Sequence, residues 1–162
     1  MMNSILQINT PAALAQMLAI LSAQTAIAVD TEADSLYSYF EKVCLVQIST
    51  RDADYIVDSL AVDLAPLGAI FADARIEKTF HAAEYDLLSM KRDYHFEFAN
   101  LFDTMIAARV LGWKNIGLGN ILQERYGVAL NKKFQRADWG QRPLSAEQIA
   151  YARDDTHFLL AL

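Results

Sequence analysis

A short apolar segment that ends in two carboxylates constrains the fold of this chain more than any other feature. Residues 26–29 are apolar and half β-branched, which predicts a buried central strand. Asp30 and Glu32 follow, with Thr31 between them, and because strand side chains alternate, both carboxylates project from one face. Two anions about 6–7 Å apart in an apolar setting repel one another and lose solvation. A divalent cation between them would remove this cost, and hard oxygen ligands suit Mg²⁺ or Mn²⁺. The alternative is a pair of solvated loop acids beyond the end of the strand.

The composition indicates one globular domain over residues 1–162, which is long enough to bury a core without disulfides. Cys44 is the one cysteine, so a disulfide framework is excluded and a reducing compartment is indicated. The N-terminus lacks a signal-peptide pattern, and no run of about 18 apolar residues occurs. These features predict a cytoplasmic protein that does not enter a membrane.

The distribution of charge favours a nucleic-acid partner, although the net charge of −6 argues against one. Seven basic and two acidic residues lie between Arg109 and Arg142. A basic band beside an acidic cluster fits a phosphodiester substrate that is delivered to metal ions. The alternative is an ordinary solvated surface on which the charges cluster by chance.

The hydrophobic periodicity predicts helices and strands in mixed order. A helix begins at Pro11 with Thr10 as its N-cap. Strands are predicted at 26–32, 42–49 and 55–58, and the short links between them indicate an antiparallel meander. The next elements are predicted as a helix at 63–73, a strand at 78–81, a helix at 83–93, a short strand at 98–102, and helices at 104–111 and 115–126. This order predicts an α/β fold with a mixed β-sheet, an antiparallel meander plus parallel strands, flanked by helices.

The last helix is the best-specified element of the chain. Ser145 forms a capping box with Gln148. Tyr151 and Asp155 lie one turn apart on the packed face, whereas His157 points to the other side. A carboxylate on a packed face is costly without a partner, and a metal ion would supply one. The alternative is that Tyr151 donates a hydrogen bond to Asp155 in a purely structural pair.

A fourth acid would complete the group, and two residues compete for this role. Asp103 stands at a helix start, where N-capping already explains it. Asp86 lies inside the helix after the fourth strand and has no such explanation, so it is the preferred candidate.

At these positions the sequence resembles the DEDD superfamily of 3′→5′ exonucleases. The three motifs of that superfamily correspond to Asp30-Thr31-Glu32, His81-Ala82-Ala83-Glu84-Tyr85-Asp86 and Tyr151-Ala152-Arg153-Asp154-Asp155. The last motif is similar to the Tyr-x-x-x-Asp subclass, since Ala150 stands where the histidine subclass has its histidine. The stretches 43–49, 101–104 and 138–144 resemble the ribonuclease D group in particular. The resemblance covers the chain from about residue 24 onward and implies a ribonuclease H-like fold.

The resemblance implies a metal-dependent 3′→5′ exonuclease that releases nucleoside 5′-monophosphates. Two divalent ions, Mg²⁺ or Mn²⁺, would lie about 4 Å apart. Asp30 would bridge both ions, Glu32 and Asp155 would hold the ion that activates water, and Asp86 would support the other through water. Tyr151 would orient the attacking water, because a hydroxyl with a pKa near 10 positions water more readily than it removes a proton.

Candidate nucleic-acid contacts surround this group. Leu36 and Tyr37 would wedge against or stack on the terminal base. His81 either contacts the terminal nucleotide or is a core histidine at the end of a strand. Trp139 either stacks on a base or packs under the last helix, and packing is the favoured interpretation. The candidate backbone contacts are Lys132, Gln135, Arg136 and Arg142.

Single-stranded RNA is the favoured substrate, and three alternatives stay open. They are a DNA exonuclease of the proofreading or repair kind, a non-catalytic nucleic-acid-binding module on the same fold, and a phosphatase that uses the same metal pair. Ribonuclease D proper carries helical nucleic-acid-binding domains after the nuclease domain, whereas this chain ends at Leu162. The comparison implies a stand-alone domain without that C-terminal helical domain. Weak, salt-sensitive binding is expected, which a homodimer or a partner protein would strengthen.

Overall fold

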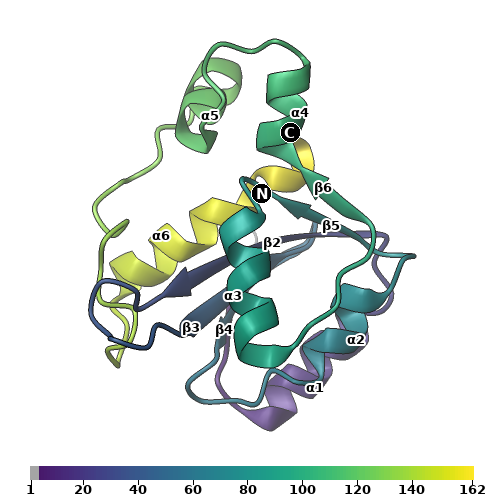
Figure 1. The fold of residues 1–162 in the computed structure, drawn as a ribbon, viewed down its shortest axis with the longest axis vertical. Coiled ribbons are helices and arrows are strands. Elements are labelled where there is room, and N and C mark those ends of the chain that lie inside the picture. The colour runs from purple at the N-terminus through teal and green to yellow at the C-terminus, as the bar shows by residue number, and fades with distance from the viewer. Residues whose placement is uncertain (1–3) are drawn as a thin grey trace.

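The computed structural model describes residues 4–162 and shows a six-stranded mixed sheet in the order β1-β4-β3-β2-β5-β6 (Figure 1). The strands are β1 (Ser4–Ile8), β2 (Ala26–Ala33), β3 (Val43–Ser49), β4 (Ala53–Asp58), β5 (Glu77–Phe80) and β6 (Leu101–Asp103). The helices are α1 (Pro11–Leu21), α2 (Leu67–Ala72), α3 (Glu84–Tyr94), α4 (Thr104–Val110), α5 (Leu118–Tyr126) and α6 (Ala146–His157), followed by the 3₁₀ helix η1 (Leu159–Ala161). Within residues 4–162, no helix has the length and apolar content needed to cross a membrane.

The predicted meander is confirmed, because β3 pairs antiparallel with both β2 and β4. Strands β5 and β6 extend the sheet in parallel on the other side of β2, and β1 pairs parallel with β4. Strand β1 was not predicted from the sequence. Four of its five residues are exposed, so it lacks the apolar alternation of a half-buried strand and is held at the edge of the sheet by its pairing with β4.

The local capping signals are confirmed, whereas two helix starts differ from the prediction. The Thr10 side chain accepts a hydrogen bond from the Ala13 amide, and the capping box of α6 is complete. The helix predicted from residue 63 begins at Leu67, directly after Pro66, whose fixed φ suits a helix start. The helix predicted from residue 115 begins at Leu118, because the backbone is extended at Gly117.

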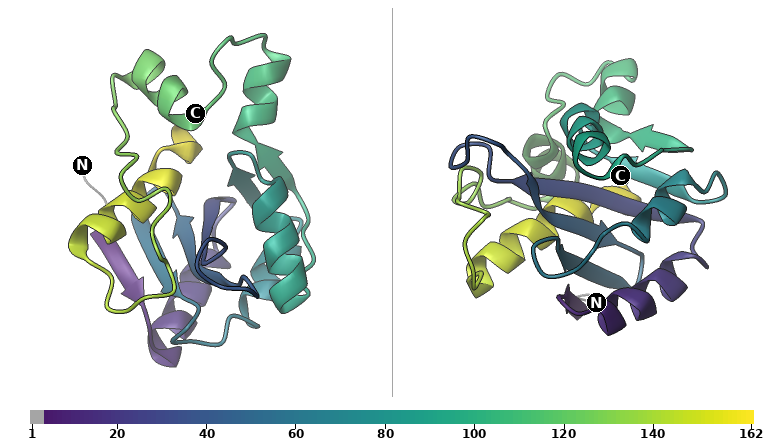
Figure 2. Two further views of the ribbon diagram at one scale, coloured as in Figure 1. Left: turned by 60° about the vertical axis from the view of Figure 1, so that its left-hand side comes forward. Right: turned by 60° about the horizontal axis from the view of Figure 1, so that its bottom comes forward.

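The sheet separates two cores, and β3 and β4 contribute side chains to both (Figure 2). On one face, Ile27 and Val29 pack against side chains of α1, α2 and α3. On the other face lies α6, which contacts β2, β3 and β4. Trp139 is fully buried there, with its ring 5.9 Å from that of Tyr151, so the predicted packing under the last helix is confirmed. Because strand side chains alternate, the face of β2 that meets α6 also presents Asp30.

Candidate active site

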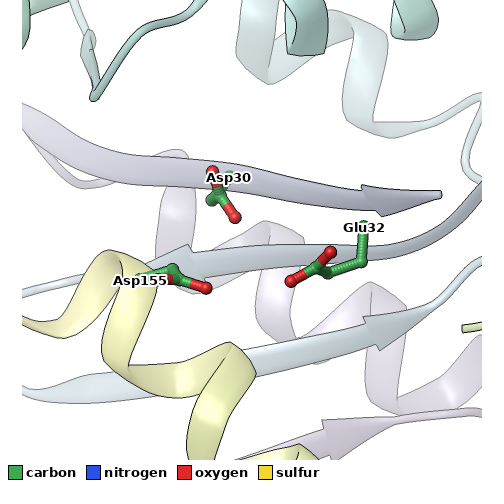
Figure 3. A group of neighbouring side chains, drawn as sticks. All are labelled: Asp30, Glu32 and Asp155. Atoms are coloured by element: carbon green, nitrogen blue, oxygen red, sulfur yellow. The ribbon is translucent and has the colours of Figure 1, made fainter. Parts of the chain in front are cut away.

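Three carboxylates converge where α6 crosses β2. Oxygens of Asp30, Glu32 and Asp155 all lie within 4.8 Å of one another. Figure 3 shows Asp30 and Glu32 on β2 and Asp155 on α6, with their carboxylates directed towards a common space. The i, i+2 spacing places the first two on one face of the strand. The third reaches them because it lies on the side of α6 that faces the sheet. The solvated loop acids of the alternative interpretation are therefore not what the structure shows.

Asp86 approaches this group from α3, on the opposite face of the sheet. Its side chain is buried and accepts a hydrogen bond of 2.5 Å from the Thr31 hydroxyl. Thr31 points away from Asp30 and Glu32 because it stands between them on the strand. Asp86 also lies in the first turn of α3, where the helix dipole favours a negative charge. The four acids thus come from both sides of one strand.

The carboxylates hold their protons more tightly than ordinary acids. Burial, followed by repulsion from Asp155 and Asp86, raises the pKa of Glu32 to about 9. Burial raises the pKa of Asp155 to about 7, with further repulsion from Asp154 and Asp86. Burial likewise raises the pKa of Asp86 to about 6, although the Thr31 hydroxyl opposes this shift.

The carboxylate of Asp30 is buried and is repelled by all three of the other acids. Burial raises its pKa well above the ordinary value, and Asp86, Asp155 and Glu32 each add repulsion. The pKa of Tyr151 is also raised by burial and then by three of these acids, Asp155 first. Tyr151 therefore keeps its proton at neutral pH and is available as a hydrogen-bond donor.

The donor set fits hard divalent cations. It consists entirely of carboxylate oxygens, which Mg²⁺ and Mn²⁺ prefer. Among residues 4–162, none of the ion pairs joins a lysine or arginine to any of these four acids. A bound cation would therefore supply the neutralising charge that the protein does not.

Asp103 has the capping role that the sequence predicted. Its side chain accepts hydrogen bonds from the amides of Met105 and Ile106 at the start of α4. It also accepts from the amides of Ala82 and Ala83 ahead of α3. Four backbone donors thus account for this carboxylate, which links the starts of two helices.

Several candidate nucleic-acid contacts lie beside the carboxylates. Leu36, Gln135 and Arg136 line a cavity of about 210 Å³ together with Glu32. The Tyr37 hydroxyl donates to the Arg136 carbonyl at 2.9 Å. The loop after β2 and the basic segment around Lys132 and Arg136 therefore lie side by side. A larger apolar cavity of about 1020 Å³ lies between α3, α4 and β6, and none of the four acids lines it.

The two other candidate contacts, His81 and Lys132, differ in their surroundings. Nδ1 of His81 lies 2.8 Å from the hydroxyl of Thr104, which itself donates to the Phe80 carbonyl. Burial lowers the pKa of His81, against the attraction of Asp103. The side chain of His81 thus belongs in part to the packing at the end of β5. Lys132 is exposed in the segment before α6.

The guanidinium of Arg142 is engaged within the protein. Its two terminal nitrogens and Nε donate to both carboxylate oxygens of Asp58 and to the carbonyls of Cys44, Trp139 and Gln141. These five hydrogen bonds use all five N–H groups of the side chain. In this structure Arg142 anchors the Trp139 segment to β3 and β4, and its contact with a nucleic-acid backbone stays a prediction.

We expect Arg142→Ala to lower the free energy of unfolding by about 1.5–3 kcal/mol, the scale of hydrogen bonds to a charged group. The Arg142 and Asp58 side chains are only 26% and 19% exposed, so water replaces these bonds poorly. Lys133→Ala is the matched control, since Lys133 and Glu147 are 62% and 67% exposed and a surface pair contributes little. Urea denaturation measures both variants, and equal losses would contradict the structural role of Arg142.

The sequence also did not reveal two contacts that hold the site in place. One is the hydrogen bond from Thr31 to Asp86, described above. The other is His157, which was predicted to point away from the packed side of α6. Its Nδ1 instead lies 2.8 Å from the carboxylate of Asp54, a fully buried acid on β4 that also accepts from the Ser49 hydroxyl. Helix α6 lies across three strands, β2, β3 and β4. His157 therefore reaches β4 even though it is not on the same side of the helix as Asp155.

A mixed sheet on which carboxylates of β2 and α6 converge, with a further acid from α3 close enough to act on them, is the arrangement expected of a metal-dependent 3′→5′ exonuclease. The chain belongs to the 3′–5′ exonuclease family, whose profile matches residues 5–162. It is 41% identical to the exosome complex exonuclease RRP6 of Saccharomyces cerevisiae over 155 residues, which are 94% of this chain and 21% of that protein.

Solved structures of relatives confirm the predicted ribonuclease H-like fold. The catalytic core of RRP6 from Trypanosoma brucei matches with a TM-score of 0.94 and 40% identity, over 98% of this chain and 44% of that one. Escherichia coli RNase D, described as an exoribonuclease involved in structured RNA processing, matches with a TM-score of 0.89 and 33% identity, over 99% of this chain and 43% of that one. The chain thus spans about a fifth of the RRP6 protein and less than half of either solved chain.

Proposed function

We propose that this chain hydrolyses single-stranded RNA from its 3′ end and releases nucleoside 5′-monophosphates with the help of two divalent ions, Mg²⁺ or Mn²⁺. The observation that carries the proposal is the convergence of Asp30, Glu32 and Asp155 within 4.8 Å, with Asp86 close enough to raise the pKa of Asp30 and Glu32. The names of the RRP6 and RNase D relatives support an exonuclease that acts on RNA.

The roles of the acids follow from their positions. Asp30 is the acid on which the other three act electrostatically, so it is proposed to contact both ions. Glu32 and Asp155 would complete one ion site, and Asp86 would support the other. When bound, the ions would neutralise charge on the scissile phosphodiester and supply a water of lowered pKa.

Tyr151 is proposed to orient the attacking water through its hydroxyl. Its raised pKa keeps it protonated, which makes it a hydrogen-bond donor and excludes it as a general base at neutral pH. Its ring is held by Trp139 at 5.9 Å and Phe134 at 6.1 Å. In the reaction, the water oxygen attacks phosphorus and releases one proton to solvent, the bond from phosphorus to the 3′ oxygen breaks, and that oxygen takes a proton from solvent.

The proposed contacts to the RNA lie around the cavity beside Glu32. Leu36 would separate the terminal base from its neighbour, and Tyr37 would support that base from the same loop. The proposed contacts to the strand are the exposed or cavity-lining side chains Lys132, Gln135 and Arg136, with His81 as a candidate contact to the terminal nucleotide. An acidic chain would bind weakly and with strong salt dependence, and sedimentation with and without RNA would show whether a homodimer forms. The cytoplasmic location stays a prediction.

Digestion of matched 5′-labelled RNA and DNA oligomers, with Mg²⁺ or Mn²⁺ and with a chelator as control, tests the proposal. We expect stepwise shortening of the RNA from its 3′ end, with 5′-monophosphates as products. Faster shortening of the DNA would favour the DNA exonuclease. Binding without shortening would favour a non-catalytic module, and phosphate release from mononucleotides alone would favour a phosphatase.

We expect Thr31→Val to lower the turnover number for RNA by about 10–100-fold, the effect of losing a group that orients a metal ligand. The substitution removes the hydroxyl that donates to Asp86 and keeps the shape of the side chain. Thr31→Ser retains the donor and is the matched control, with activity close to that of the unmodified chain. Steady-state rates at saturating metal provide the measurement. Equal activity of the valine and serine variants would contradict the positioning role.

A further inference from the structure

Two aromatic side chains at the tip of the β2–β3 loop (residues 34–42) are exposed without a structural reason. Tyr39 is 94% exposed and Phe40 is 82% exposed, and their rings lie edge to face with centroids 4.9 Å apart. Neither ring belongs to the two hydrophobic cores. Adjacent apolar surfaces of this kind commonly mark binding sites.

The loop that carries them is anchored at its base. The Asp34 carbonyl accepts hydrogen bonds from the amides of Tyr37 and Ser38, and its side chain accepts from the Lys42 amide at 2.8 Å. The Ser38 hydroxyl donates to the Phe40 carbonyl at 2.9 Å. The exposed tip is therefore presented on an ordered base, which lowers the entropy cost of binding.

Two neighbouring segments hold the sides of the loop. On one side, the Tyr37 hydroxyl donates to the Arg136 carbonyl. On the other, Glu41 accepts hydrogen bonds from Tyr85 and Arg92 of α3. The loop thus bridges the basic segment and α3, and Figure 2 shows it beside the segment that precedes α6.

The position and charge of the β2–β3 loop favour a nucleic-acid strand as its ligand. The loop starts at the end of β2, and Leu36 and Arg136 line the cavity beside Glu32. Of the two acids of the loop, Glu41 is paired with Arg92 and Asp34 accepts from the Lys42 amide at the base. Two cations border the loop, since Lys42 ends it and Arg136 lies against it through the Tyr37 hydroxyl. A loop whose base lines the proposed site for the terminal nucleotide, and whose tip carries exposed rings, suits unpaired bases on a phosphodiester backbone.

We propose that Tyr39 and Phe40 form a stacking platform for bases of single-stranded RNA upstream of the terminal nucleotide. The proposal rests on the proposed exonuclease function and extends its substrate site beyond the residues that contact the scissile bond. Stacking on an aromatic ring tolerates any base, so the platform would select for unpaired strands and for length, not for sequence.

The test compares a dinucleotide and a heptamer RNA as substrates of the Tyr39→Ala/Phe40→Ala double variant. Both side chains are exposed, so the variant is expected to fold, and its melting temperature verifies this. We expect the KM for the heptamer to rise about tenfold, the scale of losing one stacked base. The kcat for the heptamer and both constants for the dinucleotide would stay unchanged. A heptamer KM within about twofold of the unmodified value, or equal effects on both substrates, would overturn the platform.

Two controls identify the kind of contact. Tyr39→Leu/Phe40→Leu keeps the apolar surface and removes the aromatic faces, so it should behave like the alanine variant. Retention of heptamer binding by the leucine variant would instead overturn aromatic stacking, because apolar contact alone would then account for the binding. Val110→Ala, at an exposed apolar position on α4, should leave all constants unchanged.

Fluorescence anisotropy of the labelled heptamer in the presence of a chelator separates failure of this inference from failure of the proposed function. Binding does not require hydrolysis. If the unmodified chain leaves RNA intact, the exonuclease proposal fails, and a weaker affinity of the alanine variant still supports the platform. An unchanged affinity overturns the platform regardless of activity.

Discussion

Asp30→Asn is expected to lower exonuclease activity by roughly 10³-fold or more, the scale of losing a group that stabilises transition-state charge, and to stabilise the metal-free protein. The carboxylate of Asp30 is the one that burial and all three neighbouring acids act upon. Asparagine keeps its size but removes an anion that would contact both ions, so catalysis should be lost. The same change removes repulsion among the acids, so the melting temperature without metal should rise, by roughly 2–4 °C for each kcal/mol gained.

Asp52→Asn is the matched control for this experiment, since Asp52 is an exposed acid in the β3–β4 turn. It should leave both activity and melting temperature unchanged. Rates of RNA shortening and thermal unfolding in the presence of a chelator are the two measurements. Activity within tenfold of the unmodified chain, or a lower melting temperature, would contradict the central role of Asp30.

The metal-free protein is expected to lose stability as the pH rises from about 5 to about 9. The pKa values of Asp86, Asp155 and Glu32 in the folded chain are about 6, about 7 and about 9, above the ordinary values of 3.8, 3.8 and 4.5. In this range the folded chain binds more protons than the unfolded chain, so stability falls with pH. The contribution is complete below pH 4 and is lost stepwise through the three folded values. His81 opposes it near pH 6, because its pKa is lowered.

A divalent ion should reverse this loss. Binding to the folded chain alone stabilises it by about 2.7 kcal/mol at a concentration of 100 times Kd, which corresponds to a rise of roughly 5–11 °C in melting temperature. The effect should grow with pH, because metal binding must displace protons from the raised carboxylates. Melting curves from pH 5.5 to 9 with Mn²⁺, Mg²⁺ or a chelator provide the test, and Asp155→Asn should flatten the pH dependence. A stability that depends on neither pH nor metal would argue against a cation site formed by these acids.

Much of the fold could be predicted because its signals are local. The Thr10 cap of α1 and the capping box of α6 depend on residues three positions apart, and the alternation of β2 determines that Asp30 and Glu32 share a face. The antiparallel meander could also be predicted, since short links between apolar runs permit few arrangements. Strand β1 was missed because an exposed edge strand has no apolar pattern of its own. The start of α2 was misplaced because Pro66 stands where the apolar periodicity alone would continue the helix.

The sequence by itself determined which acids are the candidates for the site, because motif spacing and helix phase are properties of neighbouring residues. Only the tertiary structure decided what holds those acids in place. The contacts of Thr31 with Asp86, Arg142 with Asp58 and His157 with Asp54 join residues that are 55, 84 and 103 positions apart. Such pairs leave no periodic pattern in the chain, since their partners are selected by how helices pack on the sheet. For the same reason, an arginine in a basic segment became a structural anchor, while the tip of the β2–β3 loop remained open to solvent.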